Sequence, residues 1–370
     1  TTHIEANTIK KVPERIMKHL ARNIFKAMGQ EEYEIPDYTQ IDDHAEAKKT
    51  MKTYLEDLIE QVDQESSVEV TQAVQEAREI LESKLFIEQK GIRSLVDKDA
   101  RVGHKSKTQN FYGYKAEICQ TTDGSLITSV TVEPGSYVDG SHFKEQLEES
   151  QKAGLIVTGV YGDKAYFRYD IIKLIEENQA IPYIPVSASS YKVNEELFSY
   201  NKDSDQWFCA MGNQTIGVKS KTFDRKGKEV KLLEYIFERE RCRNCTRRAE
   251  CMGKSTNIAR KMRVSVNTPE LYEYNQRAKT LEFLEEYRKR AKIEPKNAEL
   301  KRFHGLNRAK GYGLSSIRTQ AKLTALAVNL KRIAKLVSAL KVPNNHVLCF
   351  LSQLLLISLN RWNKSAIAVA

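Results

Sequence analysis

Three early stretches of the chain repeat apolar residues at every third or fourth position. They cover residues 13–28, 41–62 and 70–86, and the first begins with a proline, which suits the start of a helix. The pattern predicts three amphipathic helices. A polar turn around residues 64–67 predicts that the second and third helices pair as an antiparallel hairpin.

A different pattern, of β-branched and aromatic residues, marks strands before and after this helical region. Short alternating or apolar runs predict strands at residues 2–8, 111–119, 125–132, 155–163 and 181–186, and helical spacing returns at 139–152 and 169–178. The order is therefore strand, helical insert, strand, strand, helix, strand, helix, strand. Strands that alternate with helices predict an α/β sheet covered on its faces.

The last third of the chain is helical in pattern. Thr268, Pro269 and Glu270 predict the start of a long helix that runs toward Glu294, and residues 305–313 form a basic loop. Residues 316–340 predict a second long helix, whose apolar seam either packs on the sheet or forms a dimer zipper; the seam holds Leu323, Leu326, Leu330, Ile333, Val337 and Leu340. Residues 347–359 predict a buried tail helix, too short to cross a bilayer.

Composition adds a preference for an anionic partner. The chain has 370 residues, 41% hydrophobic and 29% charged, which is typical of an ordinary soluble protein without disordered tracts. Its formal net charge of +10 favours an anionic partner, of which nucleic acid is the commonest. The first residues contain neither an initiator methionine nor a signal peptide, so we expect that the chain is a piece of a longer one.

One stretch of the predicted helix combines an aromatic, two cations and a carboxylate at fixed spacing. Tyr287, Arg290, Glu294 and Lys301 follow the pattern Tyr-x2-Arg-x3-Glu-x6-Lys, which places all four on one face of a regular helix. Such a face suits a site where a carboxylate binds a metal and cations hold phosphates. A solvated charged face is the alternative. Pro295 predicts a kink near Glu294.

A second carboxylate follows a predicted buried strand. Asp163 ends the run at 155–163, and side chains at the carboxyl ends of such strands gather at one edge of the sheet, where ligands bind. A helix cap or turn is the alternative role for this aspartate.

Four cysteines lie in the segment between the last strand and the Tyr287 stretch. Cys242-x2-Cys245-x5-Cys251 forms a knuckle, and Cys209 is the nearest candidate for a fourth ligand. Four thiolates complete a tetrahedral zinc shell with no open position, which predicts a structural site. Free thiols are the alternative, as expected for Cys119 and Cys349 on apolar segments.

Ordered landmarks along the chain resemble one enzyme family. The spacing from Tyr287 to Lys301 resembles the YREK signature of bacterial insertion-sequence DDE transposases, and Gly162-Asp163-Lys164-Ala165-Tyr166 resembles their Ala-Asp-Lys-Gly-Tyr motif. Gly162 and Ala165 depart from that motif, and both are small. Residues 112–115, Tyr-Gly-Tyr-Lys, resemble the family's Gly-Tyr-Lys strand, and residues 97–105 resemble its Asp-x-Asp-Ala-Arg approach.

The resemblance implies a ribonuclease H-like fold. It also implies an enzyme that cuts a transposon end and joins the freed 3′ hydroxyl to target DNA. Asp163 and Glu294 would then be catalytic and hold magnesium or manganese, and the cysteine knuckle would hold zinc. Tyr287, Arg290, Lys301 and Arg308 would contact the DNA. The family's first catalytic aspartate would lie immediately before Thr1, so the chain as given is expected to bind DNA without cutting it. Asp97 and Asp99 are the nearby rivals, in a basic loop that would position a metal ligand poorly.

The expected organisation is a core interrupted by two insertions. The core comprises residues 1–12 and 97–186, with a helical insertion at 13–96, a four-cysteine zinc insertion at 187–266, the Glu294 helix and C-terminal helix at 267–340, and an apolar tail at 341–370. Double-stranded DNA and a second copy of the chain are the expected partners, in the bacterial cytoplasm and away from membranes.

Three other functions compete with transposition. They are a ribonuclease H-like nuclease without strand transfer, a catalytically inactive DNA-binding remnant, and an unrelated zinc-binding protein that handles RNA. The hairpin at 41–86 is either a packing element or a DNA-contacting arm.

Overall fold

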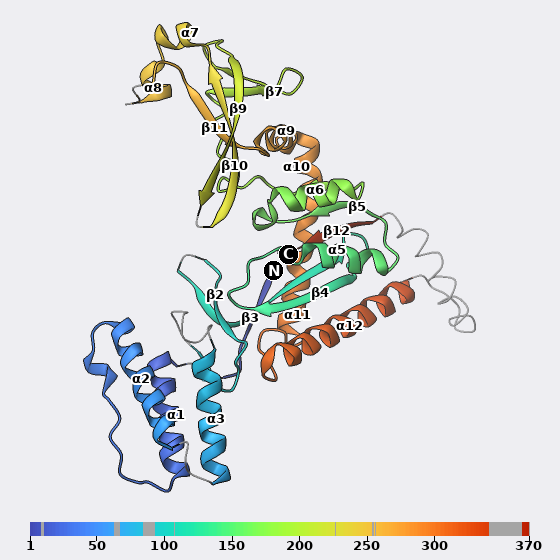
Figure 1. The fold of residues 1–370 in the computed structure, drawn as a ribbon. Helices are drawn as coiled ribbons and strands as arrows, with labels where there is room; N and C mark the ends of the chain where they lie inside the picture. The colour runs from blue at the N-terminus through green and yellow to red at the C-terminus, as the bar shows by residue number, and fades with distance from the viewer. Residues whose placement is uncertain are drawn as a thin grey trace. The chain divides into compact units, whose positions relative to one another are not determined.

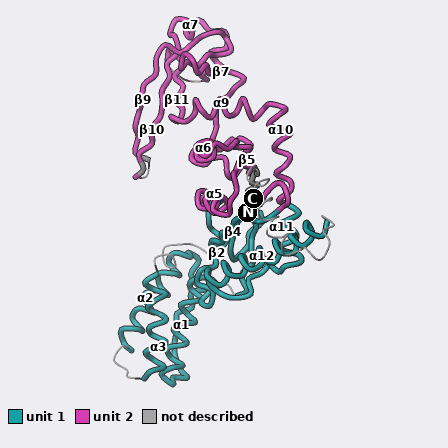
Figure 2. Tube along the Cα trace, turned by 90° about the vertical axis from the view of Figure 1, so that its right-hand side faces the viewer, with its two compact units in different colours: residues 1–119, 126–139, 294–343 teal, residues 120–125, 140–293, 344–370 magenta. Residues whose placement is uncertain are grey.

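The structure is a computed structural model that describes most of the chain. It describes residues 1–8, 11–62, 67–83, 93–106, 108–225, 227–253, 255, 257–339 and 365–369. The chain divides into two compact units (Figure 2). Unit 1 comprises Thr1–Cys119, Leu126–Asp139 and Glu294–Pro343, and unit 2 comprises Gln120–Ser125, Gly140–Ile293 and Asn344–Ala370. Both units combine helices and strands, so the fold is mixed α/β, as the sequence predicts.

The strands of unit 1 are organised around one long strand, β3 (Asn110–Thr121). β1 (Thr2–Glu5), β2 (Arg101–His104) and β4 (Ile127–Pro134) all pair with it, β1 and β2 in antiparallel register. Gly113 is paired with both Glu5 and Arg101, and a Cβ there would lie 2.1 Å from the Ile4 carbonyl oxygen. Only glycine permits this close approach of β1, at a φ of +153°. β2 lies in the segment where the sequence predicts only a basic loop.

Three helices of unit 1 form a separate hydrophobic cluster (Figure 1). They are α1 (Pro13–Ala27), α2 (His44–Val62) and α3 (Val68–Glu82), with a short 3₁₀ helix, η1 (Tyr38–Gln40), before α2. The predicted apolar faces meet, and Met17, Met51 and Ala77 are fully buried between them. The Ser67 hydroxyl accepts a hydrogen bond from the Val70 N–H and caps α3. Residues 63–66 of the predicted turn lie outside the described residues.

The C-terminal helices of unit 1 are α11 (Ile293–Arg302) and α12 (Gly313–Ala339). α12 packs on β4, where Asn329 hydrogen-bonds both the N–H and the carbonyl of Ile127 at 2.8 Å. The buried face of α12 holds mostly small residues; it consists of Ile317, Ala321, Thr324, Ala325 and Val328. The prediction that the leucine seam packs on the sheet is therefore wrong. The exposed fractions of Leu323, Leu326, Leu330 and Ile333 are 61%, 55%, 58% and 38%.

Unit 2 contains a parallel arrangement of three strands. β5 (Val157–Tyr161) pairs in parallel with β6 (Ile181–Tyr183) and with β12 (Ser365–Val369). Helices α5 (Phe143–Lys152) and α6 (Tyr169–Glu177) alternate with them in the order that the sequence predicts. The predicted tail helix at 347–359 lies outside the described residues.

The rest of unit 2 is antiparallel and rich in aromatic residues. β7 (Phe198–Asn201) pairs with β8 (Gln206–Cys209), and β10 (Lys228–Phe237) lies between β9 (Thr215–Arg225) and β11 (Lys261–Ser265). Trp207 is fully buried, with the rings of Tyr200, Tyr235 and Tyr272 within 6.2 Å of its own.

Two short helices and two longer ones complete unit 2. They are α7 (Arg239–Arg243), α8 (Arg248–Met252), α9 (Thr268–Ala278) and α10 (Leu281–Tyr287). The prediction of a single long helix from Thr268 toward Glu294 is wrong, because α9 ends at Ala278 and Lys279 is its C-cap. Thr280 then caps α10 by accepting a hydrogen bond from the Phe283 N–H. Within the described residues, no helix combines the length and apolarity that crossing a membrane requires.

Candidate functional site

Asp163 lies directly after the parallel strand β5, where the sequence places it. Its Oδ1 atom accepts a hydrogen bond from the Ala165 N–H at 2.8 Å and caps the 3₁₀ helix η2 (Lys164–Tyr166). The cap role is therefore confirmed. The second oxygen, Oδ2, lies 3.7 Å from an Arg290 guanidinium nitrogen, and 36% of the aspartate side chain is exposed. One oxygen fixes the carboxylate, and the other faces a cation.

The stretch that carries Tyr287, Arg290, Glu294 and Lys301 is not one regular helix. Tyr287 ends α10, Arg290 lies in the 3₁₀ helix η3 (Arg288–Lys292), and α11 begins at Ile293. A 3₁₀ helix turns 120° per residue instead of 100°, so five residues shift the phase by about 100°. The prediction of one regular helix is therefore wrong, and a shared face for the four side chains stays a prediction. Pro295 accounts for the interruption, because it cannot donate to the carbonyl of residue 291.

A hydrogen-bond network attaches this stretch to β5 beside Asp163. The Tyr161 hydroxyl donates to a Glu286 carboxylate oxygen at 2.7 Å, and the Lys289 ammonium lies 2.7 Å from both oxygens of Glu286. Burial, and then Glu286, raises the pKa of Tyr161, so the phenol keeps its proton and remains a donor. Arg290 follows Glu286 by four residues and reaches Asp163. No local sequence pattern indicates this network, because Tyr161 and Glu286 lie 125 residues apart.

Lys301 and Glu294 lie on α11 in unit 1. Glu294 is exposed in the first turn of the helix, and Lys301 is partly buried against β1, with its Nζ atom 3.1 Å from Nδ1 of His3. Burial, and then Lys105, lowers the pKa of Lys301 to about 8. Burial, and then Lys301, lowers the pKa of His3 to about 4, so the imidazole is neutral near pH 7 and accepts from the ammonium. Asp163 and Glu294 belong to different units, and their approach stays a prediction.

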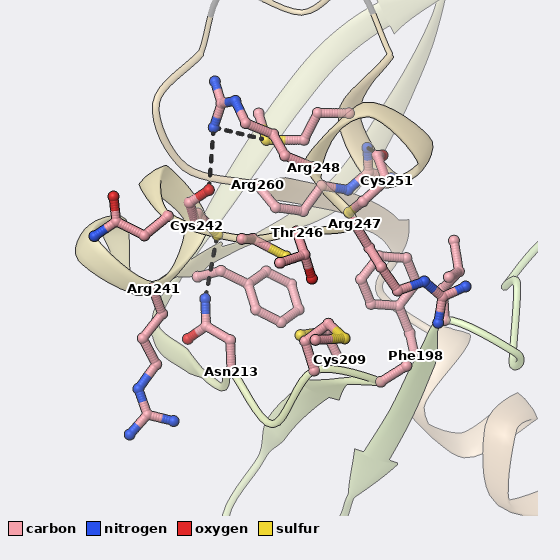
Figure 3. A pocket seen from close by; sticks show the side chains of 17 residues that line it. Phe198, Cys209, Asn213, Arg241, Cys242, Thr246, Arg247, Arg248, Cys251 and Arg260 are labelled. Atoms are coloured by element: carbon pink, nitrogen blue, oxygen red, sulfur yellow. Dashed lines mark hydrogen bonds between the residues drawn. The ribbon is translucent and has the colours of Figure 1, made fainter.

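The four cysteines line one cavity of about 270 Å³ in unit 2. Figure 3 shows Cys209 at the end of β8, Cys242 on α7 and Cys251 on α8 around it. Cys245 lies between the two helices and lines the same cavity. Burial, and then the neighbouring cysteines, raises the pKa of the Cys251 thiol, and Arg260 opposes this.

Asn213 lines the same cavity as the cysteines. Asn213 donates a hydrogen bond to the Cys242 sulfur at 3.2 Å. Among the residues that the structure describes, no three His, Cys, Asp or Glu side chains form a metal-binding group.

Comparison with protein families gives one match. Residues 208–334 match the family model described as "Transposase DDE domain". Over these residues the chain is similar to a DDE transposase domain. Comparisons with curated proteins and with solved structures found no match.

The transposase match includes most of the candidate site residues. All four cysteines lie within it, as do Tyr287, Arg290, Glu294, Lys301 and Arg308, whereas Asp163 precedes it. Tyr287 stacks on Phe283, with ring centroids 6.4 Å apart, and Arg308 is exposed beside β1, where the backbone of Glu5 hydrogen-bonds that of Asn307 and Ala309.

The rival carboxylates, Asp97 and Asp99, have structural partners. Oδ1 of Asp97 accepts hydrogen bonds from the Tyr114 hydroxyl and, at 3.2 Å, from the Gly313 N–H. Oδ2 of Asp99 accepts from the Leu314 N–H at 2.7 Å. Both aspartates therefore cap the N-terminus of α12, and Asp97 is fully buried.

Proposed function

We propose that the chain acts in cut-and-paste DNA transposition, through metal-dependent cleavage at the ends of an insertion sequence and transfer of the freed strand. The match over residues 208–334, which contains Glu294 and Lys301, carries this proposal. The place of Asp163 supports it, since a half-exposed carboxylate after a parallel strand suits a ligand-binding edge. The fold that we propose is ribonuclease H-like, with residues 13–96 and 187–266 as insertions.

Asp163 and Glu294 are the proposed catalytic carboxylates. Carboxylate oxygens are the ligands that magnesium and manganese prefer, and Oδ2 of Asp163 makes only a 3.7 Å ion pair, so the donor chemistry fits. Bound magnesium would supply Lewis acidity for in-line displacement at phosphorus. The backbone cap on Oδ1 holds the Asp163 carboxylate in one orientation, and Arg290 offsets its charge before DNA arrives.

The remaining site residues are proposed to hold the DNA. Arg290, Lys301 and Arg308 would contact backbone phosphates, which fix the position of the duplex without reading its sequence. Tyr287, half-buried against Phe283, would contact the backbone or stack on a base.

A structural zinc ion is proposed for the cysteine cavity. Four thiols line one space, and burial, and then the neighbouring cysteines, raises the pKa of the Cys251 thiol. A bound cation favours the thiolate form, and zinc is the usual cation for a set of four cysteines. Cys209, Cys242, Cys245 and Cys251 would hold it.

The proposed assembly is a homodimer on double-stranded DNA, in the bacterial cytoplasm. The exposed seam of α12 supports a second copy, since Leu323, Leu326, Leu330 and Ile333 follow the 3-4-3 spacing of a coiled coil. Sedimentation of a Leu326→Glu variant tests it: a mass equal to that of the parent protein would contradict this interface.

The decisive experiment supplies the protein with transposon-end DNA, magnesium and a target duplex. Joined products support transposition, cleavage without joining supports a nuclease, and binding without either supports an inactive DNA-binding remnant.

A further inference from the structure

A polar cavity in unit 1 is lined by neither of the proposed catalytic carboxylates. Its volume is about 570 Å³, within the range of ligand pockets. It is lined by α1, α3, the segment after β1, residues 93–96 and the loop after α11. Three of its lining residues are cationic, Lys11, Arg93 and Arg308, and Glu76 is its one carboxylate.

Backbone pairing brings these cations together from distant parts of the chain. Lys11 and Arg93 exchange two backbone hydrogen bonds, at 2.8 and 2.7 Å, as a directly opposed antiparallel pair. Beside them, the hydroxyls of Thr8 and Ser94 lie 2.6 Å apart. Arg308 is fixed by a parallel bridge to Glu5. The position of the cations is therefore set by the main chain, not by the side chains alone.

The pairing of Lys11 with Arg93 places two positively charged side chains opposite each other. Residues directly opposed in an antiparallel pair have their Cβ atoms about 5 Å apart, and like charges there are destabilising. Arg93 is only 6% exposed, and burial, and then Arg101, lowers its pKa. Within the described part of the chain, neither Lys11 nor Arg308 has a carboxylate within 4.0 Å. An anion in the cavity would relieve this repulsion.

We propose that this cavity binds a phosphate group of DNA, as an anchor separate from the catalytic edge. The inference rests on the proposed function, because it takes DNA as the source of the phosphate. Asn7, Thr8 and Asn23 add neutral hydrogen-bonding groups around the cations, and Tyr312, 51% exposed, lies at the same cavity. Contacts of this kind carry no base recognition, so the anchor strengthens binding equally for every sequence.

The test measures binding of the full chain to a duplex of arbitrary sequence over a range of salt concentrations. Lys11→Gln should weaken binding and lower the slope of log affinity against log salt by about one. Lys11→Arg should retain the slope. Lys26→Gln, an exposed lysine elsewhere on α1, is the matched control and should leave it unchanged. A slope for Lys11→Gln equal to that of the parent protein overturns the inference.

A second variant is expected to change DNA affinity in the opposite direction. Glu76→Gln removes the carboxylate of the cavity and should tighten DNA binding, an outcome that misfolding cannot produce. Unchanged or weaker binding by this variant also overturns the inference.

Inorganic phosphate identifies the source of the ligand. If it binds in a Lys11-dependent manner while the DNA slope is insensitive to Lys11, the cavity takes free phosphate and the assignment to DNA is wrong. If the parent protein binds no DNA at all, the proposed function fails together with the anchor. If the parent protein binds DNA normally and Lys11→Gln leaves the salt slope unchanged, only the proposal of the anchor is wrong.

Discussion

Two regions of unit 2, the edge around Asp163 and the cysteine cavity, are built in opposite ways. Asp163 follows a strand with parallel partners, and the contacts of Tyr161, Glu286 and Lys289 hold the neighbouring helical stretch against that strand. The cavity lies between a two-stranded hairpin and two five-residue helices, and helices of that length are not stable alone. The carboxylate edge is therefore held by its own contacts, whereas the proposed zinc ion would stabilise the cysteine region.

The largest effect is expected from a substitution that removes the charge of Asp163 but keeps its role as a cap. Asp163→Asn should abolish DNA cleavage, because the amide cannot replace a charged metal ligand, while asparagine still caps η2. Gel assays measure cleavage, and thermal unfolding measures the fold. Asp170→Asn, an exposed aspartate seven residues on, is the control. Full cleavage by Asp163→Asn would show that this residue acts only as a cap and not as a metal ligand.

Metal removal should disrupt the cysteine region while leaving the edge in place. Protein purified without chelator should contain about one zinc ion per chain, and structural zinc contributes roughly 10 kcal/mol or more in isolated fingers. Chelation or Cys242→Ser should expose α7 and α8 to proteases, as read by mass spectrometry. Thr246→Ser, which also alters the cavity lining, should have no such effect. Metal-free protein with an intact region would show that the thiols are structural without zinc.

A smaller effect is expected from the lowered pKa of Lys301. With a pKa of about 8, this lysine is mostly charged at pH 7 and mostly neutral at pH 9, so its phosphate contact should be lost as pH rises. DNA affinity should fall several-fold over that range, and Lys301→Arg should flatten the profile, since arginine stays charged. His3 is neutral throughout this range. If the DNA affinities of the parent protein and Lys301→Arg depend on pH in the same way, Lys301 does not contact DNA.

The smallest effect tests the packing beside Asp163. A Cβ at Gly162 would lie 3.2 Å from Cγ1 of Ile184 and 3.3 Å from Cβ of Tyr166, so the neighbours must yield by a few tenths of an ångström. Gly162→Ala should change the free energy of unfolding by about 1 kcal/mol or less. Denaturant unfolding measures it. A loss several times larger would mean that the edge is too rigid for the alanine of the resembling motif.

Much of the fold was predictable because local patterns determine it. Apolar spacing located α1, α2 and α3, and the strand before Asp163 was located correctly because a short apolar run ended at a Gly-Asp pair. The orientation of α12 was not predictable. Periodicity finds a stripe, but the stripe that packs on the sheet is the one of small residues around Ala321 and Ala325, and the leucines stay exposed.

The candidate site was predictable only where its residues form local motifs. Asp163 and the cysteines were found by spacing, whereas the attachment of Glu286 to Tyr161 has no local signal. The break between α9 and α10 did have one, because Thr280 is a good cap within an otherwise helical run.

The caps that Asp97 and Asp99 provide have a consequence for synthesis of the protein on the ribosome. Asp97 binds the Gly313 N–H, which lies 216 residues further along the chain. At roughly 5–20 residues per second, translation of that interval takes roughly 10–40 s. During this time the segment around Asp97 has emerged, but the helix that it caps does not yet exist. The segment around Asp97 therefore completes its structure only after the 216 residues up to Gly313 have been made.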